Sequence, residues 1–80
     1  MDRLTMRKEI LARRPKGRAG YSVYGSRVMP AIEFFNSLDN KDREVFYETL
    51  KLLLNDEDTS VRDFAVALCL GFFVLRDSVE

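Results

Sequence analysis

The sequence contains no histidine and only one cysteine, and these two shortages limit the chemistry that the protein can carry. Histidine is the most common general acid or base in enzymes and the most common ligand of zinc. Cys69 has no second cysteine with which to form a disulfide or a paired zinc site, and a lone cysteine favours a reducing compartment. We therefore expect a cytoplasmic protein that is not an enzyme and that holds no metal or other cofactor.

Long apolar runs are also missing. The longest, residues 64–75, is much shorter than the about 20 residues that a helix needs to cross a bilayer. Residues 1–14 are basic but contain no apolar core of the kind found in signal peptides. The sequence predicts neither a membrane span nor an export signal.

What is present is a composition typical of one compact domain: 80 residues, of which 46% are hydrophobic and 32% charged. The formal net charge is zero, but the charge is distributed unevenly. Residues 1–28 contain eight Lys or Arg and two Asp or Glu, whereas residues 29–80 contain five Lys or Arg and eleven Asp or Glu. We predict a single domain over residues 1–80, with a basic N-terminal helix and arm in residues 1–28 and an acidic helical body in residues 29–80.

Capping residues and helix breakers predict the first helix. Asp2 can cap a helix over residues 3–13, which Pro15 and Gly17 then stop. The apolar side of this helix is assigned to Leu4, Ile10 and Leu11.

The next two helices follow closely. Pro30 suits the first position of a helix that runs to Leu38, because a residue at that position needs no N–H. Asp39 is the expected N-cap of a third helix over residues 40–55. The core-facing stripe of the third helix consists of Phe46, Leu50, Leu53 and Leu54.

A polar turn over residues 55–58, with Thr59 or Ser60 as cap, predicts a last helix. This helix begins with an ordinary apolar stripe and then becomes apolar around its whole circumference. The residues that complete the circle are Val66, Cys69, Leu70, Phe73 and Val74. Because a helix that is apolar on every side must be covered on every side, we expect a protein partner or, preferably, a second copy of the chain in a homodimer.

These elements predict an all-α fold, a small bundle of four helices whose last two form an antiparallel hairpin. Residues 70–75 leave an alternative open, because they are rich in aromatic and branched side chains and contain Gly71. In that alternative the fold is α+β, with a short strand pair made by residues 20–28 and 70–75.

One segment resembles a known family. Residues 50–71, LKLLLNDEDTSVRDFAVALCLG, resemble the middle of a HEAT repeat: a leucine-rich helix ends in a short acidic turn, and a second helix opens with Val61-Arg62 and ends in Leu70-Gly71. The resemblance implies an antiparallel helical hairpin and a scaffold or binding role.

The preferred functional prediction is a small protein–protein interaction module. It would act through an apolar C-terminal surface centred on Phe72, Phe73 and Leu75. Bacterial or phage regulators, inhibitors and immunity-type proteins are examples of such modules.

The alternative is a nucleic-acid-binding protein that uses a basic arm. The arm consists of Arg13, Arg14, Lys16 and Arg18, followed by Tyr21 and Tyr24. Basic groups neutralise phosphates and aromatic rings stack on bases, which together suit a single-stranded nucleic acid. In the other interpretation, which we prefer to nucleic-acid binding, the arm lies on the protein's own acidic face, made by Glu44, Glu48, Asp56 and Asp58.

Overall fold

The computed structural model describes residues 1–14 and 28–78, and within the second range it describes side chains as far as residue 73. These residues form four helices and no strand: α1 (Arg3–Ala12), α2 (Met29–Ser37), α3 (Asn40–Leu53) and α4 (Thr59–Ser78). The prediction of a small all-α bundle is confirmed. The boundaries differ slightly, since α2 begins one residue before Pro30 and α3 ends at Leu53 rather than at residue 55.

The α+β alternative is wrong for residues 70–75, because they continue α4. The other half of that strand pair falls almost wholly on residues 20–27, which lie outside the described residues, and Val28 is the N-cap of α2. Phe64, Leu68 and Gly71 are buried and follow one another at intervals of three and four residues. This helical period on the inner face of α4 outweighs the local β propensity of the segment.

Aspartates cap the first and third helices as predicted. The Asp2 side chain accepts a hydrogen bond from the Thr5 N–H at 2.7 Å, and the Asp39 side chain accepts one from the Asp42 N–H at 2.8 Å. Each bond satisfies one of the backbone N–H groups that a helix leaves unpaired at its start.

The cap of α4 differs from the prediction, which named Thr59 or Ser60. The carboxylate of Asp58 accepts hydrogen bonds from the Ser60 backbone N–H at 2.9 Å and from the Ser60 hydroxyl at 2.8 Å. The ionised carboxylate is the stronger acceptor, so the serine hydroxyl serves as a donor to the cap rather than as the cap itself.

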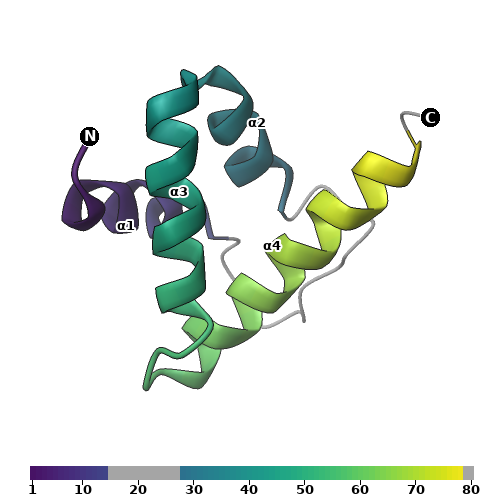
Figure 1. Cartoon of the computed structure of the whole chain (residues 1–80). Coiled ribbons are helices and arrows are strands. Elements are labelled where there is room, and N and C mark those ends of the chain that lie inside the picture. Colours follow the sequence, from purple (N-terminus) through teal and green to yellow (C-terminus); the bar gives the residue numbers. More distant parts are fainter. Residues whose placement is uncertain (15–27, 79–80) are drawn as a thin grey trace.

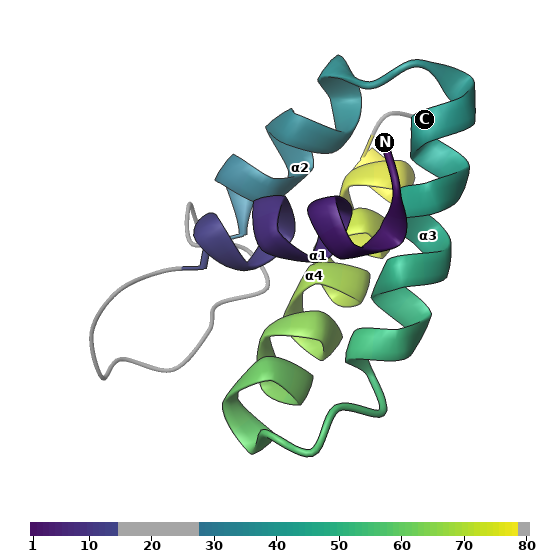
Figure 2. The same ribbon diagram turned by 90° about the vertical axis from the view of Figure 1, so that its left-hand side faces the viewer.

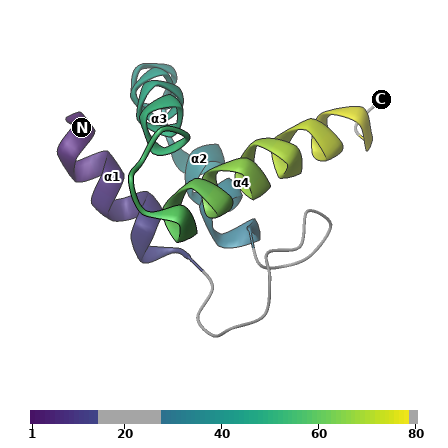
Figure 3. The same cartoon turned by 90° about the horizontal axis from the view of Figure 1, so that it is seen from below.

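The helices α3 and α4 form the frame of the molecule (Figure 1). Helix α3 ends and α4 begins at the turn formed by residues 54–58. The two helices run in opposite general directions and move apart with distance from this turn, so that together they outline a V. Helix α2 lies within the opening of this V, and α1 packs across α3 (Figures 1 and 2). The C-terminal turns of α4 extend beyond the other three helices (Figure 3).

The core lies where the inner faces of the four helices meet. Its largest fully buried side chains are Met6, Ile10, Val28, Phe46, Leu53, Phe64 and Leu68. In α1 the prediction placed Leu4 on the apolar side, but Leu4 is 66% exposed and Met6 is buried instead. Met6 and Ile10 are four residues apart and therefore share a face of the helix, whereas Leu4 and Ile10 do not.

Candidate interaction surface on α3 and α4

The outer face of α4 carries three large apolar side chains that the described part of the chain covers only in part. Val66 and Leu70 are each 47% exposed, and Phe73 is 62% exposed. They are four and three residues apart, so they form one stripe along the helix. We call Val66, Leu70 and Phe73 the α4 stripe.

A groove adjoins the stripe. It has a volume of about 480 Å³ and lies between α3 and α4. The residues that line this α3–α4 groove are Tyr47, Leu50, Lys51, Leu54, Cys69 and Phe72. Cys69 lines the groove and lies three residues after Val66 and four before Phe73, so it shares their face of α4, and the groove and the stripe form one continuous apolar surface.

Phe72 anchors the floor of the groove to the core. Its ring centroid lies 4.9 Å from that of Phe35 and 5.8 Å from that of Phe46, both in edge-to-face arrangements. Tyr47, on the rim of the groove, has its ring centroid 6.5 Å from that of Phe72. These contacts join α2, α3 and α4, and they hold the surface in a fixed shape.

The three side chains predicted for the partner surface therefore differ from one another. Phe73 is largely exposed, Phe72 is half-buried in the aromatic cluster, and Leu75 belongs to α4 but its side chain lies outside the described residues. The prediction did not place Val66 and Leu70 in the partner surface. Their signal was present, however, since both belong to the set that makes the helix apolar all round.

Cys69 has the chemistry of a packing residue. Its side chain is half-buried, and burial raises the pKa of the thiol above its ordinary value. The thiol thus stays protonated near neutral pH, and a protonated thiol is a poor nucleophile. Within the described ranges no three His, Cys, Asp or Glu residues are grouped so as to share a metal ion.

The described start of the basic arm is held by contacts within the protein. The guanidinium of Arg13 bonds to the Glu9 carboxylate at 2.7 Å and lies 4.1 Å from the centre of the Phe34 ring. The Nε of Arg14 donates to the Leu11 carbonyl at 3.3 Å. The rest of the arm, Lys16, Arg18, Tyr21 and Tyr24, lies outside the described residues, so nucleic-acid binding stays a prediction.

The acidic face is contacted by Arg7 of α1. The charge of Arg14, in the described part of the arm, also acts on it: the pKa of Asp58 is lowered, first by the hydrogen bonds from Ser60 and to a smaller extent by Arg14. The Arg7 guanidinium bonds to Asp56 at 2.9 Å, and the backbone N–H of Asp58 donates to the other carboxylate oxygen of Asp56 at 2.9 Å. Both hydrogen bonds lower the pKa of Asp56 below its ordinary value, and the bond from the Asp58 backbone has the larger effect. Glu44 and Glu48 are exposed on α3.

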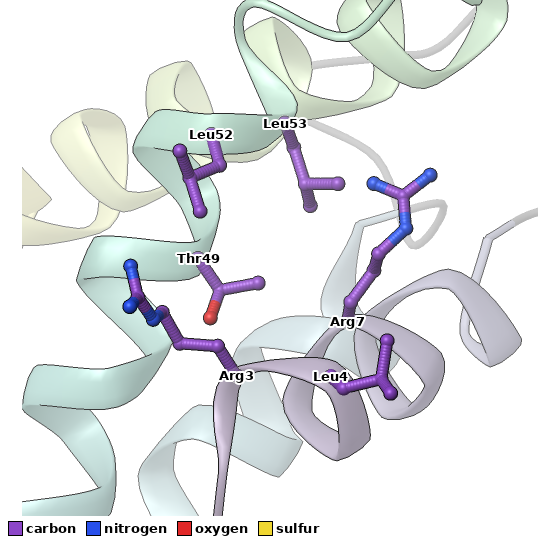
Figure 4. Close-up of a pocket in the computed structure, with 6 residues that line it drawn as sticks. All are labelled: Arg3, Leu4, Arg7, Thr49, Leu52 and Leu53. Carbon is purple, nitrogen blue, oxygen red and sulfur yellow. The ribbon is translucent and has the colours of Figure 1, made fainter.

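A second, smaller groove lies between α1 and α3 (Figure 4). It has a volume of about 200 Å³ and is lined by Arg3, Leu4, Arg7, Thr49, Leu52 and Leu53. Its polar groups are largely engaged elsewhere, because Arg7 is paired with Asp56 and the Thr49 hydroxyl donates to the Val45 carbonyl at 2.7 Å. The larger apolar surface is thus the stronger candidate site.

No known protein family, curated protein or solved structure shows a significant match to this chain. The resemblance of residues 50–71 to a HEAT repeat accordingly stays a prediction. Among the described residues, no helix has both the length and the apolar character that a membrane span requires.

Proposed function

We propose that this protein is a small protein–protein interaction module that binds through the α4 stripe and the α3–α4 groove. A regulator, an inhibitor or an immunity-type protein acts in this way, by occupying a surface of another molecule. The observation that carries the proposal is the exposure of the α4 stripe, Val66, Leu70 and Phe73, beside an apolar groove.

The energetics support a binding role for the α4 stripe. Complete burial of a large apolar side chain stabilises a complex by about 1.5–3 kcal/mol, and each stripe residue has about half of its surface still to bury. Burial of the whole stripe therefore contributes on the order of 3 kcal/mol. Contiguous exposed apolar residues of this size are typical of binding sites, whereas single ones are ordinary on any surface.

Site-specific photo-cross-linking in the native host tests the proposal. A photoreactive p-benzoylphenylalanine is introduced at Phe73 in one variant and at Leu52 in the control. Leu52 is similarly exposed, at 55%, but it lines the smaller groove between α1 and α3. We expect protein adducts, identified by mass spectrometry, from position 73 and far fewer from position 52. Equal yields from the two positions, or no adduct from position 73, would contradict the proposal.

A further inference from the structure

Charged and apolar residues of α4 are spaced at intervals of seven residues around the stripe. Arg62-Asp63, Cys69-Leu70 and Arg76-Asp77 are spaced by seven residues, and Val66 and Phe73 lie between them with the same spacing. The backbone is helical throughout, from Thr59 to Ser78. Residues seven apart in a helix lie on nearly the same line, so each set forms a row parallel to the helix axis.

The three rows give the outer face of α4 a definite charge pattern. Val66 and Phe73 occupy the central row. One neighbouring row contains the positions of Arg62, Cys69 and Arg76, and the row on the other side contains those of Asp63, Leu70 and Asp77. One edge of this apolar face is therefore basic and the other edge is acidic.

From this pattern we infer that the α4 stripe binds a second copy of the chain, with the two α4 helices parallel about a two-fold axis that runs along them. The inference rests on the proposed function and names its partner. In a parallel pair, the two-fold axis brings the basic edge of one helix against the acidic edge of the other on both sides of the interface. Val66 and Phe73 of one copy then face the same residues of the other.

The charge pattern also selects the orientation. In an antiparallel pair, the two-fold axis crosses the helices and sets basic edge against basic edge and acidic against acidic, which is repulsive. A foreign partner would need only an apolar face, whereas these edges complement each other within one sequence. The self-complementary surface that a two-fold dimer requires is thus present on α4.

Arg62 and Asp63, the first pair of charged residues on the two edges, are available to form ion pairs with a second copy. Asp63 is exposed, and neither Arg62 nor Asp63 makes an ion pair with any described residue. Within the described residues, the guanidinium of Arg62 donates a 3.2 Å hydrogen bond to the hydroxyl of Thr59. Both charges can therefore meet a second copy without breaking an ion pair of the described fold.

Sedimentation equilibrium of the purified chain provides the first test. We expect a dimer of the 9.3 kDa chain, with a dissociation constant raised about 100-fold by Phe73→Asp. Leu52→Asp, which adds the same charge to an exposed leucine outside the surface, should leave the dimer unchanged. Circular dichroism shows that each variant has kept its helices.

Charge reversal tests the edges. The double variant Arg62→Asp, Arg76→Asp makes both edges acidic, and Asp63→Arg, Asp77→Arg makes both basic. Each should weaken its own homodimer about tenfold or more, because attraction is replaced by repulsion on both sides. Mixing the two double variants should restore association as a heterodimer.

A single cysteine reports the orientation. In a Cys69→Ser background, Val66→Cys should form a disulfide with its own counterpart under mild oxidation, while Leu52→Cys should not. In an antiparallel pair centred on the stripe, position 66 faces position 73, and the cross-link would require a mixture of Val66→Cys with Phe73→Cys.

The outcomes separate this inference from the proposed function. A chain that stays monomeric at high micromolar concentration overturns the homodimer, and adducts from position 73 to a different protein would then preserve the interaction module alone. A dimer that is unaffected by Phe73→Asp also overturns the inference. A dimer that cross-links only in the mixed-cysteine experiment refutes the parallel arrangement.

Discussion

Replacing Phe72 with alanine should destabilise the isolated chain, whereas replacing its neighbour Phe73 should leave its stability nearly unchanged. The two residues are adjacent on α4 and have the same side chain. Phe72 packs edge-to-face against Phe35 and Phe46, while Phe73 is 62% exposed. The pair thus separates a residue that supports the fold from one that is available to a partner.

The expected magnitudes follow from burial. A fully buried Phe→Ala substitution costs about 3–5 kcal/mol, so the half-buried Phe72 should cost about 2 kcal/mol. For Phe73, the buried part of the ring contributes less than about 1 kcal/mol, and the better helix propensity of alanine offsets about half of that. In a domain of this size about 2 kcal/mol lowers the melting temperature by roughly 10 °C.

Urea unfolding followed by circular dichroism at 222 nm measures both effects. The protein must be diluted until sedimentation shows a monomer, because association would otherwise add to the apparent stability. Leu68→Ala serves as a reference for a fully buried position on α4 and should cost about 2–5 kcal/mol. The reasoning is refuted if Phe73→Ala costs the monomer as much as Phe72→Ala.

Three other predictions concern the helix caps, the acidic face and the basic arm. Asp39→Ala removes the acceptor of the Asp42 N–H and should lower the free energy of unfolding by about 1 kcal/mol, as measured in urea. The folded pKa of Asp56 lies below its ordinary value of 3.8, so its contribution to stability is present above that pH and is lost as the pH falls through the folded pKa. Stability should therefore decline in acid, and Arg7→Ala should make the decline shallower in urea titrations between pH 2 and 6. If the basic arm binds single-stranded nucleic acid, the affinity of the purified chain for it should fall steeply as salt rises, because binding releases counterions.

Each of these three has a control. Asp39→Asn keeps a side-chain acceptor, so a loss as large as that of Asp39→Ala would contradict the capping role. Lys51→Ala removes an exposed cation that pairs with no described carboxylate, and it should leave the acid decline as in the original chain. Absence of nucleic-acid binding at low salt would end the alternative function of the arm.

Local signals of the sequence predict the helices well, because caps and breakers act within a few residues. Asp2 and Asp39 cap the helices assigned to them, and the spacing of Phe46, Leu50 and Leu53 identifies the buried face of α3. The prediction of Thr59 or Ser60 as the cap of α4 was wrong. The carboxylate of Asp58 accepts the Ser60 N–H, and the backbone geometry of the turn decides which side chain can reach that group.

Burial was harder to predict than helicity. In the short helix α1, few turns are available to define an apolar face, and Leu4 was preferred to Met6, which is the buried residue. On α4 the sequence shows apolar residues on every side, and it does not say which side the rest of the chain covers. The partner surface was therefore assigned to Phe72, Phe73 and Leu75 together, although Phe72 is half-buried and only Phe73, of the two whose side chains are described, is mostly exposed.

The sequence by itself determined the four helices and the seven-residue order of charges and apolar residues along α4, because both depend on spacing within one segment. Tertiary structure decided which face of α4 stays open. Helices α3 and α4 diverge from their common turn, so α2 and α3 cover the inner face of α4, while Val66, Leu70 and Phe73 stay in solvent. Which side of a helix is covered depends on the angle at which distant segments meet, and a pattern of residues within one helix carries no record of that angle.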